Sequence, residues 1–100
     1  MPLHTVKEFN KLYNSSKKYH TKYFVLFLQK DGQKRFSVVA SKKIGNAVKR
    51  AYAKRRLRAL FIKKADDLKD SIVLVAKKDI VDAPFVKLEY LFNKALKALL

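Results

Sequence analysis

The residues best suited to act on another molecule in this 100-residue sequence are its cations, which are concentrated in the middle of the chain. Between Gly32 and Ala65 there is no acidic residue, yet this segment holds half of the 24 lysine and arginine residues. So many like charges are tolerated only where they point into water or contact a polyanion. The formal net charge of +16 therefore predicts binding to the phosphate backbone of a nucleic acid, with a membrane surface as the lesser alternative.

The spacing of these cations places them along the sides of a helix. Asn46 is a good N-cap for a helix that runs to about Ala65. One face of this helix is apolar and is assigned to the core, through Ala53, Leu57, Leu60 and Phe61. Cations follow both borders of that stripe, with Arg50, Lys54 and Arg58 on one side and Lys49, Arg56 and Lys63 on the other. Like charges one turn apart destabilise a helix by about 0.2–0.5 kcal/mol per pair. A merely solvated face normally mixes both signs, so a helix that keeps several such pairs is predicted to use them for binding.

Catalytic chemistry is not expected from this chain. His4 and His20 have no second ligand at metal-binding spacing and are interpreted as surface residues. The carboxylates of Asp66, Asp67 and Asp70 are interpreted as a solvated loop rather than a cation site. No phosphate-binding loop, zinc-protease motif or serine-hydrolase motif is present. We therefore predict no catalytic residue and no metal ligand, and binding as the function of the protein.

Aromatic residues are the second group that could bind another molecule. Seven of the twelve lie within the first 36 residues, so they are concentrated in one part of the chain. Rings beside cations suit a single-stranded nucleic acid, whose bases stack on the rings while the cations hold its backbone. Packing of the same rings into the core is the alternative, and both interpretations stay open at this point. The seven are Phe9, Tyr13, Tyr19, Tyr23, Phe24, Phe27 and Phe36.

A mixed set of helices and strands must position these groups. Thr5 is expected to cap a short helix through Asn14, with Phe9 and Tyr13 on one face. Residues 22–29 predict a strand with two apolar faces, and Asp31-Gly32 predicts a hairpin to a partner strand over residues 35–41. Residues 71–77 predict a buried strand that joins the sheet parallel to a neighbour. A final helix beginning near Pro84 has an apolar face formed by Phe85, Leu88, Phe92, Ala95, Leu96 and Leu99.

Length and composition suit one domain over residues 1–100, since 49% of the residues are hydrophobic. The chain has no cysteine, so disulfides and thiolate metal sites are excluded and an intracellular, cytoplasmic setting is expected. We find no signal peptide and no apolar run long enough to cross a membrane, so no membrane contact is expected.

The segment from Ser41 to Arg58 resembles the signature of the protein subunit of bacterial ribonuclease P, and reads S-K-K-I-G-N-A-V-K-R-A-Y-A-K-R-R-L-R. Four cations match the family pattern residue for residue, namely Arg50, Lys54, Arg55 and Arg58. Ala51 and Tyr52 depart from it, because the family usually has Asn at the first position and Arg or Lys at the second. Phe9 with Tyr13, and the run from Tyr23 to Phe27, are similar to two further family segments, so the resemblance covers nearly the whole chain.

The resemblance implies an α/β (α+β) two-layer sandwich with the order α-β-β-β-α-β-α. It also implies a four-stranded sheet and a left-handed β-α-β crossover around the basic helix, against the usual preference. Family members bind a large catalytic RNA, and together they remove the 5′ leader from precursor tRNA. The RNA holds the Mg²⁺ ions and performs the hydrolysis, so no cofactor bound by the protein alone and no further protein partner are expected.

The residue pattern and the family resemblance together predict two surfaces that contact RNA. The expected RNA-binding residues of the basic helix and its preceding turn are Lys42, Lys43, Asn46, Lys49, Arg50, Lys54, Arg55 and Arg58. The expected leader-binding cleft is lined by Phe9, Tyr13, Tyr23 and Phe27. A basic ribosomal or RNA-chaperone protein without a role in cleavage is the alternative, and a DNA-binding module is a distant third.

Overall fold

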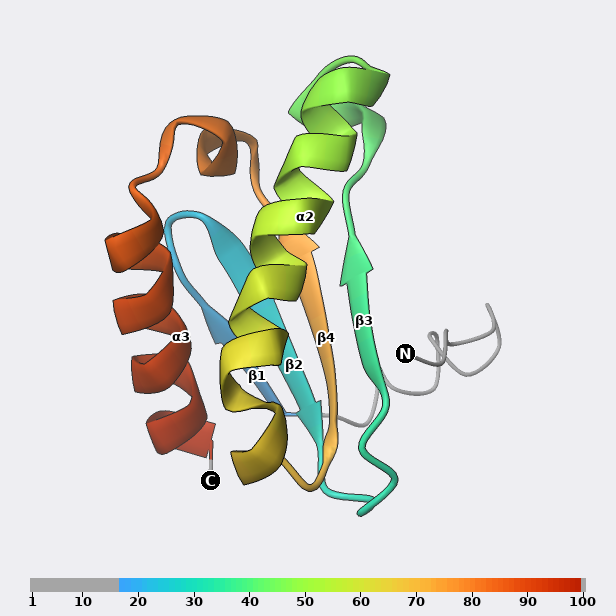
Figure 1. Ribbon diagram of the computed structural model, residues 1–100, viewed down its shortest axis with the longest axis vertical. Coiled ribbons are helices and arrows are strands. Elements are labelled where there is room, and N and C mark those ends of the chain that lie inside the picture. The colour runs from blue at the N-terminus through green and yellow to red at the C-terminus, as the bar shows by residue number, and fades with distance from the viewer. Residues whose placement is uncertain (1–16, 100) are drawn as a thin grey trace.

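The computed structural model describes residues 17–99, and Figure 1 shows them as a four-stranded sheet with two helices on one of its faces. The strands and helices are β1 (Lys17–His20), β2 (Phe24–Gln29), β3 (Phe36–Val39), α2 (Ala47–Lys64), β4 (Ser71–Ala76) and α3 (Phe85–Leu99). Short 3-10 turns lie between them at Lys42–Ile44, Ala65–Asp67 and Lys78–Asp82. From β1 onward this is the expected order of the two-layer fold. The helix expected over residues 5–14 lies outside the described residues.

The strand order in the sheet is β1-β2-β4-β3, and only the β3–β4 pair is parallel. The hairpin expected between residues 22–29 and 35–41 is therefore wrong, because β4 lies between those two strands. Asp31 and Gly32 do form a turn, but the Asp31 carboxylate accepts hydrogen bonds from the backbone N–H and hydroxyl of Ser71, at the start of β4. β4 is almost wholly buried and needs neighbours on both edges, so it takes a central position.

The connection from β3 through α2 to β4 is a left-handed crossover. β3 and β4 are parallel neighbours, with Phe36 opposite Ile72. Figure 1 views the sheet from its helix side with both strands pointing upward, and β4 lies to the left of β3. The usual right-handed connection would place the second strand on the right. This is the handedness that the family resemblance implied.

Both helices begin where the sequence predicted. The Asn46 side-chain oxygen accepts a hydrogen bond from the Lys49 N–H at 2.9 Å, which caps α2. The buried residues of α2 are those predicted for its apolar stripe, Ala53, Leu57, Leu60 and Phe61. The residues of α3 that are buried also come from its predicted apolar face, as Leu88, Phe92, Ala95 and Leu96. Amphipathic periodicity therefore identified both helix faces.

Three aromatic rings join the helices to the sheet. Phe61 on α2 stacks on Phe36 of β3, with ring centroids 4.8 Å apart, and meets Phe92 of α3 edge-to-face at 6.0 Å. Aromatic pairs in these two geometries add to the free energy gained by burying their area. The helix that carries the cations is thus packed against both the sheet and α3 through these rings.

Candidate nucleic-acid interface

The turn before α2 presents two lysines beside the first backbone N–H groups of the helix. The Ser41 hydroxyl accepts a hydrogen bond from the Lys43 N–H at 3.3 Å and caps the 3-10 turn, and Lys42 and Lys43 are both exposed. The amino end of an α-helix carries a partial positive charge and unpaired N–H donors. This arrangement is suited to a phosphate group.

Gly45 allows this turn to meet the helix closely. Its φ of 140° and ψ of −150° lie in a region that is essentially restricted to glycine. A Cβ at this position would stand 2.8 Å from the Cδ atom of Lys49. The aliphatic part of the Lys49 side chain therefore packs against the Gly45 backbone, which brings this lysine to the turn that carries Lys42 and Lys43.

One border of α2 offers cations without carboxylate partners. Arg50 and Lys54 are half-buried at the base of this border, and Arg58 is exposed. None of the three forms an ion pair with another residue of the described part of the chain, where the ion pairs are Arg35–Asp31 and Lys63–Glu89. The Nε atom of Arg50 is buried and makes no hydrogen bond within residues 17–99. These guanidinium and ammonium groups are available to an external anion.

The opposite border of α2 is used to hold α3. Lys63 forms an ion pair with Glu89 at 2.9 Å, and its Nζ atom lies 5.5 Å from the centre of the Phe85 ring. Arg56 donates hydrogen bonds to the Tyr52 hydroxyl and to the carbonyl oxygen of Ala83. The two cationic borders, which looked equivalent in the sequence, therefore differ in their contacts. Of the second border, Lys49 alone faces the turn and stays in the candidate interface.

Tyr52, which departs from the family pattern, lies between Arg56 of the second border and Arg55 on the outer side of the helix. Its ring centre is 5.6 Å from the Arg55 guanidinium carbon and 5.1 Å from that of Arg56. Cations over an aromatic face are attracted by the ring quadrupole. The ring thus helps to hold Arg55, which is exposed and among the expected RNA-binding residues.

The aromatic residues expected in the cleft do not share one surface in the described part of the chain. Tyr23 precedes β2, is 7% exposed and belongs to the main core. Phe27 is 3% exposed and belongs to a second apolar cluster with Val25 and Val73, edged by the half-buried side chains of Val39 and Val75. Phe9 and Tyr13 lie outside the described residues. The expectation that β2 is apolar on both faces is confirmed, since Phe24, Leu26 and Leu28 belong to the main core.

Neither a metal site nor a membrane span is found in the part of the chain that the structure describes. Within residues 17–99 no three His, Cys, Asp or Glu side chains come together in a way that could hold a metal ion. The helices there are also too short or too polar to cross a bilayer. No step of the chemistry is assigned to the described residues.

Comparison with known proteins points to one family. The sequence profile of the family described as Ribonuclease P matches residues 1–100. The chain is 42% identical over 96 residues to the ribonuclease P protein component of a Nitratiruptor species, covering 95% of this chain and 88% of the relative.

Solved structures have the same fold. The ribonuclease P protein of Staphylococcus aureus superposes with a TM-score of 0.81 and 23% identity, over 96% of this chain and 92% of that one. The protein from Thermotoga maritima gives a TM-score of 0.79 and 22% identity, over 95% and 94% of the two chains.

Proposed function

This chain belongs to the ribonuclease P protein family, and we propose that it holds both the catalytic RNA and the 5′ leader of precursor tRNA within that ribonucleoprotein. It is the RNA-binding protein subunit of an endoribonuclease that acts in tRNA processing, and its partner is the ribonuclease P RNA. The family match does not favour the alternative of a ribosomal or RNA-chaperone protein. The assignments to individual residues below are our proposal.

The free border of α2 binds the catalytic RNA in this proposal. The observation that carries it is the difference between the two borders: Lys63 has a carboxylate partner, whereas Arg50, Lys54 and Arg58 have none within residues 17–99. No carboxylate within residues 17–99 neutralises these three charges, so they remain available to the phosphates of an RNA. Phosphate contacts of this kind supply most of the affinity of a protein for RNA without regard to sequence.

The turn before α2 extends the same surface. Lys42, Lys43 and Lys49 surround the amino end of the helix, and Asn46 fixes where the helix begins. A phosphate bound there would meet lysine side chains and backbone N–H groups together. Arg55, which is exposed beside Tyr52, adds a further cation on the outer side of the helix.

The leader is proposed to lie against the sheet face that carries Phe27. This face is apolar, with Val25, Phe27 and Val73 at its centre and half-buried Val39 and Val75 beside them. Phe27 is only 3% exposed, so in this proposal it shapes the floor from beneath, and the partly exposed side chains of Val39 and Val75 present the apolar surface to the strand. Apolar contact of this kind is independent of base sequence, which suits leaders that differ between precursors. Phe9 and Tyr13 complete the cleft in the proposal, and Tyr23 supports it from the main core.

Catalysis is assigned to the RNA. We propose that Mg²⁺ is held mainly by the RNA subunit and that the protein needs neither a cofactor nor another protein partner. A cytoplasmic location, where precursor tRNA is made, is part of the same proposal.

A matched pair of lysines on α2 tests the RNA-binding border. Lys54→Ala removes a cation without a carboxylate partner, whereas Lys63→Ala removes one that is paired with Glu89. Affinity for the ribonuclease P RNA should fall for Lys54→Ala. The slope of log K against log salt concentration should also become less steep by about 0.7–0.9, because one phosphate contact is lost. Lys63→Ala should leave that slope unchanged. Equal slopes for both variants would contradict the assignment of the free border to RNA.

A further inference from the structure

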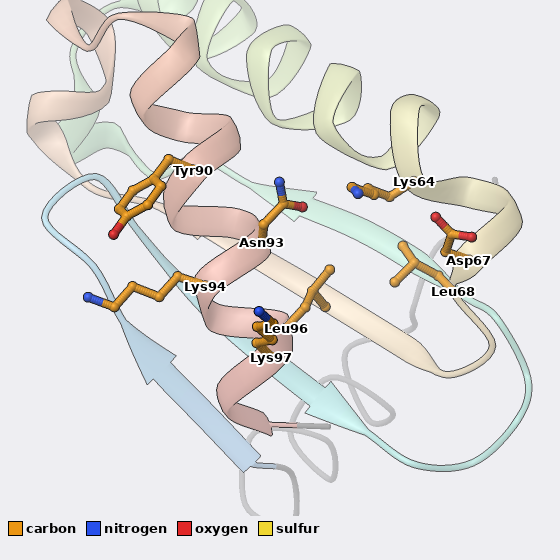
Figure 2. Close-up of a pocket in the computed structure, with 8 residues that line it drawn as sticks. All are labelled: Lys64, Asp67, Leu68, Tyr90, Asn93, Lys94, Leu96 and Lys97. Atoms are coloured by element: carbon orange, nitrogen blue, oxygen red, sulfur yellow. The ribbon is translucent and has the colours of Figure 1, made fainter.

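A groove lies on the helix side of the molecule, where the carboxyl-terminal halves of α2 and α3 run side by side. Figure 2 shows the residues that line it. Its volume is about 700 Å³. Lys64 and Leu68 line it from the end of α2 and the turn that follows, and Tyr90, Asn93, Lys94 and Lys97 line it from α3. None of these residues belongs to the basic border, the turn or the sheet face described above.

The charge of the groove is positive. Lys64, Lys94 and Lys97 contribute three cations against the single carboxylate of Asp67. None of the three lysines has an ion-pair partner within residues 17–99, in contrast to the neighbouring Lys63. The carboxyl ends of the two helices favour nearby cations, which accounts in part for Lys64 and Lys97. Lys94 lies further from the helix end and has no such explanation.

Tyr90 gives the groove an exposed aromatic ring. It is 62% exposed, and Val86, one turn before it on the same face of α3, is 75% exposed. Two large apolar side chains in water on one helix face are not explained by packing in the core. Figure 2 shows Tyr90 and Lys94 extending to the same side of α3. A ring beside a cation matches the requirement of an unpaired nucleic-acid strand, which stacks its bases and places its phosphates against cations.

We propose that this groove binds an unpaired segment of the ribonuclease P RNA, as a second contact separate from the basic border. The groove lies at the carboxyl end of α2, and the turn with Lys42 and Lys43 lies at its amino end. An 18-residue helix is about 27 Å long, so one phosphate cannot reach both. The RNA is therefore held at two points.

The catalytic RNA, and not the leader, is the occupant that the geometry favours. The groove is lined by α2, α3 and the turn after α2. Both helices cover one face of the sheet (Figure 1), whereas the leader is proposed to lie on the opposite face, at Phe27. Lys64 also belongs to α2, the helix whose free border is assigned to that RNA. The inference rests on the proposed function in this respect.

Paired charge reversals test the groove. The double variant Lys94→Glu/Lys97→Glu changes two lysines that line it. The double variant Lys78→Glu/Lys87→Glu is the control, because it makes the same change of net charge at two exposed lysines outside the groove. Binding of the ribonuclease P RNA is measured for each across a salt series, with thermal unfolding to verify the fold. Tyr90→Ala is measured in the same way.

The groove variant should bind the RNA at least about tenfold more weakly at 0.1 M salt. The slope of log K against log salt concentration should be less steep by about 1.4, as expected for the loss of two single-strand phosphate contacts. Tyr90→Ala should weaken binding about fivefold or more. In chemical footprinting, one unpaired RNA segment protected by the wild-type protein should become reactive with the groove variant and remain protected with the control.

Losses no larger than those of the control, together with an unchanged footprint, would overturn the groove assignment. That result would leave the proposed function intact if the wild-type protein still binds the RNA and stimulates cleavage. Failure of the wild-type protein to bind the RNA would instead reject the proposed function itself. The two failures are therefore distinguishable in one set of measurements.

Discussion

The guanidinium group of Arg56 on α2 donates a hydrogen bond to the main-chain carbonyl oxygen of Ala83, two residues before α3 begins. A second hydrogen bond from the same group reaches the Tyr52 hydroxyl. Arg56 thus links the cationic helix to the start of the last helix, while its neighbour Arg55 is exposed to solvent. Two adjacent arginines of one basic helix therefore have different tasks, the first in stability and the second in binding.

Substitution of these neighbours should separate the two tasks. Arg56→Ala removes hydrogen bonds from a charged donor and should lower the free energy of unfolding by about 1.5–3 kcal/mol. Arg55→Ala should leave the melting temperature nearly unchanged and lower the affinity for RNA, with a reduced salt slope. Thermal unfolding and RNA binding across a salt series measure both effects. The opposite pattern, with Arg55 stabilising and Arg56 salt-sensitive, would reject this division.

Gly45→Ala should damage the turn before α2. An alanine would adopt a backbone conformation that is essentially restricted to glycine, at a cost of about 1–3 kcal/mol, and its Cβ would displace Lys49. We expect a lower melting temperature and weaker RNA binding together. Gly32→Ala is the matched control, because nothing lies within 4 Å of a Cβ placed there. Its positive φ should give a loss of stability without a loss of RNA affinity beyond that of unfolding.

Asp31 should make the stability of the fold depend on acid pH. Burial by itself would raise the pKa of Asp31, but hydrogen bonds from the Gln33 and Ser71 N–H groups, the Ser71 hydroxyl and Arg35 hold it below its usual value of 3.8. A lowered pKa in the folded state means that this carboxylate stabilises the fold fully above the unfolded-state pKa. The contribution is lost as the pH falls through the folded-state pKa.

Melting temperatures measured between pH 7 and pH 3 test this linkage. The wild-type protein should lose stability below about pH 4. Asp31→Asn should have a lower melting temperature at pH 7 and a smaller decrease in melting temperature on acidification. Asp66→Asn, at an exposed position, should change neither the melting temperature at pH 7 nor its decrease appreciably. A variant with the acid dependence of the wild-type protein would show that another group is responsible.

Phe27 should contribute to stability as well as to leader binding. Because its side chain is 3% exposed, Phe27→Ala should cost about 3–5 kcal/mol of unfolding free energy and is a poor probe of binding. Phe27→Leu keeps most of the volume and should cost less than about 1.5 kcal/mol. This variant should bind precursor tRNA with a leader more weakly in the reconstituted complex, and mature tRNA as before.

Phe24→Leu is the control for that experiment, since Phe24 lies on the same strand but belongs to the main core on the helix side. It should affect stability alone. A uniform loss of affinity for both RNAs with Phe27→Leu would place the leader away from this face of the sheet.

The helices could be predicted from the sequence because their signals are local. The Asn46 cap acts within three residues, and the stripe from Ala53 to Phe61 repeats with the helical period. The pairing of the strands could not be predicted, because it depends on contacts between distant segments. Asp31 binds Ser71, 40 residues away, and this contact joins the turn to β4. β1 carries two exposed lysines and has little apolar pattern, so the family resemblance was its only signal.

The sequence predicted which residues belong to the candidate site. It did not predict which of its cations make internal contacts and which remain available for binding. Arg56 and Lys63 are cations beside the same apolar stripe as Arg58. Their partners come from distant parts of the chain, Ala83 from just before α3 and Glu89 from α3 itself. Tyr23 was expected to line the leader-binding cleft together with Phe27, but it precedes the strand. The Thr21 hydroxyl accepts hydrogen bonds from the Tyr23 and Phe24 N–H groups, and this turn breaks the alternation.

Cleavage of precursor tRNA at low Mg²⁺ concentration tests the central claim most directly. The measurement compares the protein alone, the cognate ribonuclease P RNA alone, and the two together. We predict no cleavage by rigorously RNA-free protein and a clear increase in the rate of leader removal when the protein is added to the RNA. Metal-dependent cleavage by the RNA-free protein, or an RNA whose activity is unchanged by the protein, would contradict the account.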